Sequence, residues 1–530
     1  MRVLPKVWLL LCMALVLMPL SVIMLAFGEF DQEIWGFLLD YQLPLLVKNT
    51  LILLLMTAVG VLLVGVSTAW LTAMYRFPLR GVLFWAMMLP LTVPAYVLAF
   101  VQVGMFDYTG AISTYLRQAH GFEQGLPDVR NIWGLSVVMI LTFYPYVYLL
   151  ARNAFLSMGQ QSLEVGASLG LSPKQSAMKI ALPMARPWVL GGLMLALMEV
   201  LADVGAVSIF GVETFTTAIY QAWYGFFSIE TAKQLASLLI VFVFALMFLE
   251  QVTRGGQRFA IDKSVQASIK PLQGTKAWLA TLYCVLVLTL GFLLPLGQLV
   301  VWAVADWQWQ SLHALLNPMW HSVLIGLMGA GLTAVVALLL VMAKRSDNSR
   351  FAQVATRVAT LGYAIPGAIL ALGVFVPVAG LDNWLIERLS LSEDMTGIFK
   401  GTLLVMLVAY VIRFLALAVS SVESGFERIL PSMTESAVSL GVVGHRLITK
   451  VYLPLLKGSL GIALLMVFVD IMKEMPITLM TRPYDWDTLA VRIYAYTMEG
   501  QFNEASLPAL VIVLAGLVPV IVFAKAEYRS

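Results

Sequence analysis

Twelve apolar stretches, each long enough to cross a lipid bilayer as a helix, constrain this sequence more than any other feature. The hydrocarbon core of a bilayer is about 30 Å thick and takes about 20 apolar helical residues, and lipid offers no partner to an unpaired backbone group. The chain is therefore predicted to be an all-α polytopic membrane protein with about 12 transmembrane helices. The stretches are Val7–Phe27, Val47–Met74, Val82–Val103, Ile132–Leu150, Val189–Phe210, Leu235–Leu249, Ala277–Ala303, Ser322–Ala343, Val358–Ala379, Ile398–Ser420, Gly458–Met480 and Leu507–Phe523.

The composition excludes several classes of protein. Of the 530 residues, 60% are hydrophobic and 12% are charged, whereas soluble domains have about 45–50% and 25%. A disordered or nucleic-acid-binding protein is excluded, so no nucleic acid partner is expected. The two cysteines and four histidines lack the spacing of a metal site, and no G-x-x-x-x-G-K-[ST] phosphate loop occurs. We therefore expect no cofactor, no catalytic residue and no ATP site in this chain, and a metal site stays undefined.

Positively charged side chains lie mainly on one side of the predicted helices. That side holds 24 of the 33 Lys and Arg residues, including the group from Arg413 to Lys457. The positive-inside rule assigns the side richer in these residues to the cytoplasm, so both termini are predicted to be cytoplasmic. The first stretch follows Arg2 and Lys6 and lacks a clear cleavage site, which favours a retained membrane anchor.

The chain contains an internal repeat. The segment EVGASLGLSPKQSAMKIALP at 164–183 returns as ESAVSLGVVGHRLITKVYLP at 435–454, offset by 271 residues and with seven of 20 positions identical. An offset of 272 relates three further pairs, which are Pro94 and Pro366, Asn49 and His321, and Thr50 and Ser322. The chain is thus predicted to have two halves of about six helices each.

Equal topology in both halves indicates parallel repeats about an axis along the membrane normal. The first half is predicted at 1–253, with helices 1–6, and the second at 277–530, with helices 7–12. A basic cytoplasmic linker at 254–276 joins them.

Both copies of the repeated segment lie in predicted cytoplasmic loops, at 160–186 and 431–457, and each reads as helix, turn, helix. Gly170 and Gly441 suit the left-handed conformation that ends a helix. Ser172 followed by Pro173 is typical of a helix start. Amphipathic helices at the membrane surface are the simpler interpretation. Duplication at equivalent cytoplasmic positions instead favours the docking of a partner that is itself two-fold.

The repeated segment resembles the EAA motif of importer-type ABC transporter permeases. In that family the motif forms a coupling helix that inserts into a cleft of a separate ATPase. The resemblance therefore implies two copies of an ATP-binding partner and a chain that is not itself an enzyme. This sequence has EVGASLG and ESAVSLG where the family often has EAAxxLG. The ATPase-coupling residues implied by the resemblance are Glu164, Gly170, Pro183, Glu435, Gly441 and Pro454.

Four acidic side chains lie inside predicted helices, where a charge costs about 2.5–3.5 kcal/mol on insertion scales. Glu199 and Asp203 share one helical face, and an offset of 271 leads to Asp470 and Glu474. In a structural interpretation each acid is protonated or paired, for example with Lys473. In a functional one the four acids meet across the pseudo-two-fold axis, which favours a hard, highly charged cation over an anion. The candidate residues of a translocation path or gate are Glu199, Asp203, Asp470, Glu474 and Lys473.

The segments after the two motifs, 199–223 and 467–497, are similar to those of fused ferric-iron permeases, and the similarity extends over both halves. It implies a multi-pass permease embedded in the lipid of the bacterial inner (plasma) membrane and served by a periplasmic ferric-binding protein. Fused thiamine permeases and polyamine permeases share this plan, so those substrates stay open. An ion-coupled secondary transporter does not explain two cytoplasmic motifs, and a membrane enzyme lacks a candidate nucleophile or metal cluster.

Overall fold

The computed structural model has the all-α fold that the sequence predicts. It describes residues 3–26, 35–36, 38–120, 127–254, 270–305, 309–347, 349–390 and 397–529, with the backbone alone at 3, 120, 158–165, 167, 173–174, 250, 253–254, 270, 309–312 and 523–529. Within these described residues, twelve helical segments are long and apolar enough to cross a membrane, which confirms the predicted number. The strands within the described residues are β1 (Tyr75–Arg76) and β2 (Lys270–Pro271), paired in parallel. Most of the predicted linker, at 255–269, lies outside the described residues.

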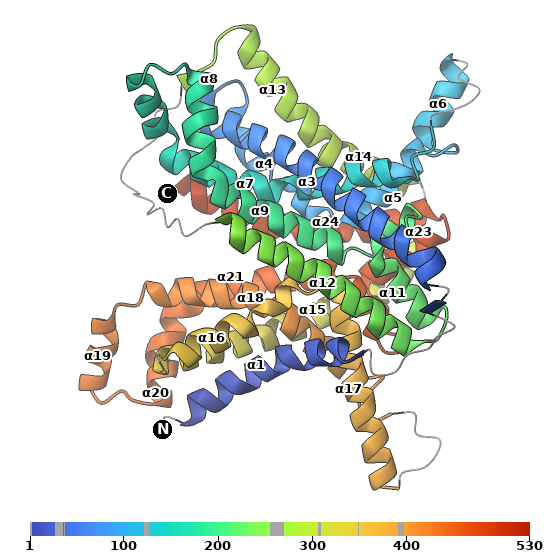
Figure 1. Cartoon of the computed structure of the whole chain (residues 1–530), viewed down its shortest axis with the longest axis vertical. Helices are drawn as coiled ribbons and strands as arrows, with labels where there is room; N and C mark the ends of the chain where they lie inside the picture. The colour runs from blue at the N-terminus through green and yellow to red at the C-terminus, as the bar shows by residue number, and fades with distance from the viewer. Residues whose placement is uncertain are drawn as a thin grey trace. The chain divides into compact units, whose positions relative to one another are not determined.

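The helices form two compact units, which we name the α7 unit and the α15 unit. The α7 unit is built around α3 (Leu43–Met74), α7 (Ile132–Ser168) and α9 (Leu182–Ala202), which pack on one another (Figure 1). A Cβ at Gly192 of α9 would lie 2.7 Å from the backbone oxygen of Tyr146, so the glycine allows α9 to pack closely on α7. The other elements of this unit are η2 (Leu38–Gln42), α4 (Arg80–Ala86), η3 (Leu89–Thr92), α5 (Ala95–Phe106), α6 (Ala111–His120), α8 (Pro173–Ser176), η4 (Ala177–Ala181), α10 (Gly205–Ile209), α13 (Thr275–Leu288), η5 (Thr289–Leu293), α14 (Leu294–Ala305) and α24 (Phe502–Arg529).

The α15 unit has an equivalent centre in α15 (Trp309–Ser346), α18 (Leu403–Glu427) and α21 (Leu453–Lys473). A Cβ at Gly329 of α15 would lie 2.6 Å from Cδ1 of Ile471, so small residues again set the helix spacing. The other elements of this unit are α1 (Val3–Met24), α16 (Arg350–Ala359), η6 (Leu361–Ala364), α17 (Gly367–Arg388), α19 (Pro431–Ser439), α20 (His445–Leu447), η7 (Ile448–Tyr452) and α22 (Pro476–Thr481). The chain passes from one unit to the other within α11 (Phe215–Tyr224), α12 (Ile229–Arg254) and α23 (Leu489–Met498).

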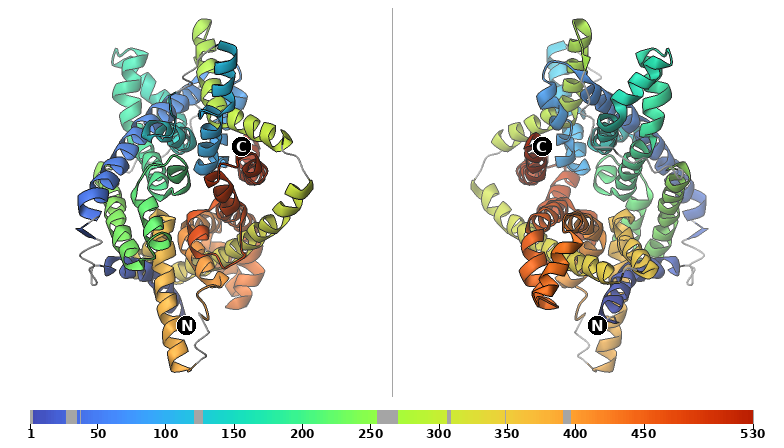
Figure 2. Two further views of the ribbon diagram at one scale, coloured as in Figure 1. Left: turned by 90° about the vertical axis from the view of Figure 1, so that its right-hand side faces the viewer. Right: turned by 90° about the vertical axis from the view of Figure 1, so that its left-hand side faces the viewer.

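Each unit includes the first helix of the sequence half that supplies most of the other unit. In the α15 unit, α1 packs against α15, α16 and α17 (Figure 2), and a Cβ at Gly373 would lie 2.6 Å from Cβ of Pro19. In the α7 unit, the hydroxyl of Tyr283 in α13 lies 2.7 Å from that of Ser67 in α3. The compact units thus combine segments of both predicted halves. The predicted halves, 1–253 and 277–530, describe the sequence repeat and stay a prediction.

Four of the predicted membrane stretches are interrupted, and the interruptions occur at repeat-related positions. Val93 and Ile365 are extended, with ψ of 114° and 126°, because a residue before proline avoids the helical conformation. Asp203 and Glu474 are extended as well, with ψ of 130° and 120°. Each of these stretches is therefore divided between helices and not a single helix; they are Val82–Val103, Val189–Phe210, Val358–Ala379 and Gly458–Met480.

Candidate functional site

The first predicted coupling loop continues directly from α7. Gly170 ends this helix with a φ of +73°, as predicted, and Leu171 N donates to Gly166 O at 2.9 Å, the outer bond of a Schellman turn. Ser172 Oγ accepts from Gln175 N at 3.3 Å, and Gln175 Oε1 accepts from Ser172 N at 3.0 Å. This reciprocal cap confirms the predicted helix start at Ser172. The side chain of Glu164 lies outside the described residues.

The second predicted coupling loop has the same glycine turn, but the helix that precedes the turn is separate from the membrane helix. Gly441 has a φ of +79°, and Val442 N donates to Ala437 O at 2.9 Å, so the predicted left-handed glycine is confirmed here too. However, α18 ends at Glu427 and a separate helix, α19, begins at Pro431. In the first loop, by contrast, α7 runs into the motif without a break.

Both loops lead into a membrane helix in the same way. A π-helical turn, η4 or η7, precedes each helix, and Pro183 and Pro454 lie in the first turn of α9 and α21. The backbone stays helical from each π-helical turn into the membrane helix, with Leu182 N bonded to Ala177 O and Leu453 N bonded to Ile448 O. Each proline, which has no N–H to donate, lies just after a π-helical turn. The two predicted coupling prolines therefore have equivalent structural positions.

A cavity of about 270 Å³ lies beside the second predicted coupling loop. Arg345 Nη1 donates to Phe426 O at 3.1 Å, and the ring of Tyr452 packs edge-on against that of Phe426 at 5.3 Å. Glu435, a predicted coupling residue, is exposed at the wall of the cavity. The cavity is lined by Met342, Arg345, Ser346, Phe426, Pro431, Thr434, Glu435 and Tyr452.

Glu474 caps the short helix that follows the break after α21. Its side chain is buried; Oε1 accepts from Ile477 N at 2.9 Å, and Oε2 accepts from Thr478 N and Thr478 Oγ1, both at 3.1 Å. The hydroxyl of Tyr410 lies 2.5 Å from Thr478 Oγ1 and joins α18 to this cap. Both carboxylate oxygens of Glu474 are thus engaged in holding the start of α22.

Asp203 has the equivalent place at the break after α9. Its Oδ1 accepts from Val207 N in α10 at 3.2 Å, and its backbone oxygen accepts from Thr216 Oγ1 at 2.7 Å. Two repeat-related acids therefore each hold a short helix after a break. The predicted meeting of acids across a pseudo-two-fold axis stays a prediction, because Asp203 lies in the α7 unit and Glu474 in the α15 unit.

The other predicted path residues lie at the ends of the same two helices. Glu199 precedes Asp203 by one turn in α9, and Asp470 and Lys473 precede Glu474 in α21. All three are partly exposed, and each interacts with other residues of the protein. Among the described residues there is no group of three or more His, Cys, Asp or Glu side chains that could hold a metal ion. In each unit the predicted path residues within the described part of the chain thus lie around a helix break and do not form a cluster that could bind a metal ion.

Arg413 is a buried charge that the sequence analysis misplaced. The charge count assigns it to a cytoplasmic loop, whereas it lies inside α18 with 8% of its surface exposed. Arg413 Nη1 donates to Ile365 O at 3.1 Å, at the break before α17, and its charge interacts with Glu474. Its position inside the predicted stretch Ile398–Ser420 was the signal that could have identified it.

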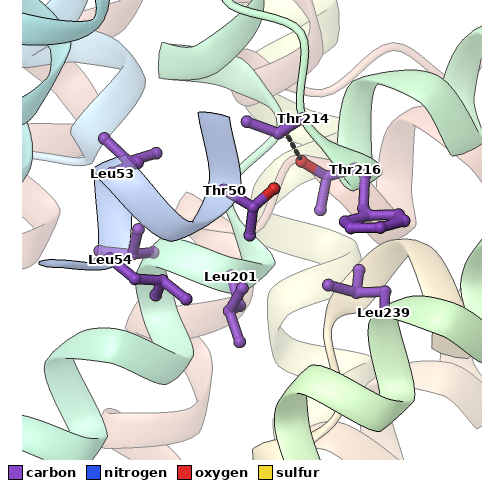
Figure 3. A pocket seen from close by; sticks show the side chains of 9 residues that line it. Thr50, Leu53, Leu54, Leu201, Thr214, Thr216 and Leu239 are labelled. Carbon is purple, nitrogen blue, oxygen red and sulfur yellow. Dashed lines mark hydrogen bonds between the residues drawn. The ribbon is translucent and has the colours of Figure 1, made fainter. Parts of the chain in front are cut away.

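A much smaller cavity, of about 10 Å³, lies in the α7 unit beside the start of α3 (Figure 3). Thr214 Oγ1 and Thr216 Oγ1 are 3.0 Å apart at its wall, and Thr50 Oγ1 has no hydrogen-bond partner among the described residues. A space of this size takes about one water molecule. It is therefore too small to be a substrate site.

Comparison with known proteins agrees with this architecture. Residues 61–252 match the family described as binding-protein-dependent transport system inner membrane component. The chain is 26% identical over 490 residues to the Fe(3+)-transport system permease protein FbpB 2 of Haemophilus influenzae, an alignment that covers 91% of this chain and 90% of that protein. The chain thus resembles a fused, two-half permease. This confirms the resemblance inferred from the repeated motif.

Two further relatives align with smaller parts of the chain. The thiamine transport system permease protein ThiP of Brucella suis is 25% identical over 57% of this chain and 56% of its own length. The molybdenum transport system permease protein ModB of Azotobacter vinelandii is 28% identical over 38% of this chain and 90% of its own length. Together with the twelve apolar helices, these similarities identify a multi-pass protein of the bacterial inner membrane that takes part in transport with partner subunits.

Proposed function

We propose that this chain is the transmembrane subunit of a binding-protein-dependent ABC importer for ferric iron. The observation that carries the proposal is the similarity to an Fe(3+)-transport permease, which extends through both halves and covers 91% of this chain. Thiamine is the second candidate substrate, because a thiamine permease aligns over 57% of the chain. Polyamines are the remaining alternative from the sequence.

The two predicted coupling loops support the proposal of an ATP-binding partner. Each loop has a left-handed glycine, Gly170 or Gly441, and leads into a membrane helix through a proline in its first turn. Two equivalent loops fit two copies of one ATP-binding subunit, with ATP hydrolysis in that partner and not in this chain. A periplasmic ferric-binding protein would deliver the iron from the other side of the membrane.

The intramembrane acids are proposed to belong to the gate of the translocation path. Because Asp203 and Glu474 are engaged as caps at helix breaks, they hold segments that a gate has to move. Glu199, Asp470 and Lys473 are partly exposed beside those breaks and would face the passing cation. Broken helices with charged residues are a recurrent construction at transport sites.

Radiolabelled uptake tests the proposed function. Cells that lack this chain are complemented with it and supplied with ferric iron, thiamine or putrescine, and parallel cells also lack the ATP-binding subunit. We expect the chain to restore uptake of ferric iron alone, and only when the ATP-binding subunit is present. Restored thiamine or putrescine uptake would reject the iron assignment, and uptake without the ATP-binding subunit would indicate a secondary transporter.

Replacement of Glu199 by Gln together with Asp470 by Asn tests the gate proposal. Both side chains are partly exposed, so removing their charge should leave the amount of protein in the membrane unchanged. We expect iron uptake to fall about ten-fold, equivalent to about 1.4 kcal/mol in the transport barrier.

Glu230→Gln is the control, because Glu230 is a partly exposed acid at the start of α12 that pairs with Lys233 at 2.5 Å. Loss of the double variant from the membrane would instead favour the structural interpretation of the acids. Uptake equal to that of the control would exclude both residues from the path.

A further inference from the structure

The loop between α22 and α23, residues 482–488, presents one aromatic side chain entirely to the outside of the protein. The side chain of Tyr484 is 99% exposed. Trp486 N donates to Pro483 O at 3.2 Å, which closes a turn around Tyr484 and Asp485. Asp485 has a φ of +62°, a conformation that aspartate tolerates better than most residues. The ring of Tyr484 is therefore displayed by a defined turn.

The base of this loop is fixed to the rest of the α15 unit. Asp487 forms ion pairs with Arg482 and with Arg492, the latter at 3.5 Å. The ring of His321 in α15 stacks on that of Trp486 with centroids 4.4 Å apart, and His321 Nδ1 lies 3.2 Å from Asp487 O. These contacts limit the freedom of the loop, so Tyr484 would lose little conformational entropy on binding a partner.

The first half has the same anchor but a shorter loop. Asn49, the repeat counterpart of His321, donates from Nδ2 to Glu213 O at 2.9 Å, as His321 contacts the backbone oxygen of Asp487. Equivalent residues of the two halves are 271 positions apart at the helix breaks, where Glu474 corresponds to Asp203. They are 274 positions apart after the two loops, where Thr488 corresponds to Thr214. The second loop is thus three residues longer between equivalent anchors, and the additional length forms the turn that displays Tyr484.

We propose that the 482–488 loop is a docking contact for the soluble substrate-binding protein of the importer, with Tyr484 as its central residue. The inference rests on the proposed function, and the predicted orientation assigns this loop to the periplasmic side. Rigid exposed aromatic residues are the typical energetic centres of protein interfaces. The partner would offer an apolar slot for the ring, a hydrogen-bond partner for the phenol and a basic side chain for Asp485.

Membrane lipid fits this loop less well. Tyrosines do anchor helices at the membrane surface, but Tyr484 lies in a turn and not at a helix end. Its neighbours Arg482, Asp485 and Asp487 are charged. Such a turn favours an aqueous protein partner over the hydrocarbon region of a bilayer.

Binding of the purified ferric-binding protein of the same bacterium to the importer tests the inference. The full chain is placed in nanodiscs with its ATP-binding subunits, and Kd is measured for the unaltered protein, Tyr484→Ala and Tyr484→Phe. We expect Tyr484→Ala to raise Kd at least ten-fold and Tyr484→Phe to raise it much less, because the ring is retained. Deletion of 483–485, which gives the loop the length of its counterpart, should have the same effect as Tyr484→Ala.

Trp278→Ala is the matched control, since Trp278 is also an exposed aromatic residue, 66% exposed, but lies at the predicted cytoplasmic end of α13. A Kd that is unchanged in both Tyr484→Ala and the deletion variant would overturn the docking role while leaving the proposed function intact. If the unaltered protein binds its ATP-binding subunits but not the ferric-binding protein, the proposed function and the docking role both fail. Equal weakening by Trp278→Ala would also overturn the assignment, because the effect would then not be specific to this loop.

Discussion

Replacing Gly170 and Gly441 by proline should abolish transport while the protein still inserts into the membrane. Both glycines have a positive φ, +73° and +79°, whereas proline fixes φ near −65°. The substitution therefore removes the turn that ends each proposed coupling helix, together with its closing bonds from Leu171 and Val442. Because both glycines lie outside the apolar spans, the membrane helices themselves should be little affected.

The measurements are iron uptake, the amount of protein in the membrane, and co-purification of the ATP-binding subunit. Gly81→Pro provides a control in another predicted cytoplasmic segment. Gly81 lies in the first turn of α4 with no atom within 4 Å of an added Cβ, where proline is tolerated. Normal uptake by the double variant would show that these loops do not couple ATP hydrolysis to transport.

The sequence predicted most of the fold because a bilayer imposes simple rules on it. Runs of about 20 apolar residues gave the right number of membrane helices. Gly170, Gly441 and Ser172 could be assigned from local rules alone, since a left-handed helix end and a helix cap depend only on neighbouring residues. The structure bears out all three local conformations.

The breaks were harder to predict from the sequence. Pro94 and Pro366 were identified as a repeat pair, but apolar residues on both sides made each stretch look continuous. At Asp203 and Glu474 the sequence showed only a charge inside an apolar run, and the carboxylates were interpreted as facing a path. Their actual partners are backbone N–H groups four residues or fewer ahead, which become available only once the helix is interrupted.

The local sequence did not indicate which compact unit each helix joins. Sequence order places α1 with the first half, yet it packs on α15, α16 and α17. That choice depends on contacts such as Pro19 against Gly373, which join residues hundreds of positions apart. Hydropathy and the offset between repeats contain no information on such pairs.

Glu474 and Gly367 should behave as a matched pair in which a change to one is compensated by a change to the other. A Cβ added at Gly367 would lie 2.9 Å from Glu474 Oε1 and 3.2 Å from Cβ of Pro476. The repeat counterparts of Gly367 and Glu474 are Ala95 and Asp203. Ala95 is the first residue of α5, as Gly367 is the first residue of α17. Helix α5 packs on α10, as α17 packs on α22. The second half thus has the longer acid opposite a residue without Cβ, and the equivalent positions of the first half hold the shorter acid and a residue with a Cβ.

We expect Gly367→Ala to lower stability by about 1–3 kcal/mol through overpacking and to reduce iron uptake. Glu474→Asp alone should weaken the bonds to Ile477 N and Thr478 N and lower stability by about 1–3 kcal/mol. The double variant recreates the combination of the first half. It should therefore recover most of the stability and uptake lost in either single variant.

The measurements form a double-mutant cycle on the apparent Tm of the purified protein and on iron uptake. Gly461→Ala is the control for the glycine change, because an added Cβ there, in α21, meets no atom within 4 Å. If the losses of Tm and uptake in the double variant are the sum of those in the single variants, Gly367 and Glu474 are not matched in size. The break before α17 and the break after α21 would then pack independently. Recovery of both stability and uptake would instead show that the fit between the acid and the helix start facing it maintains the break, and that transport depends on the break being held in that form.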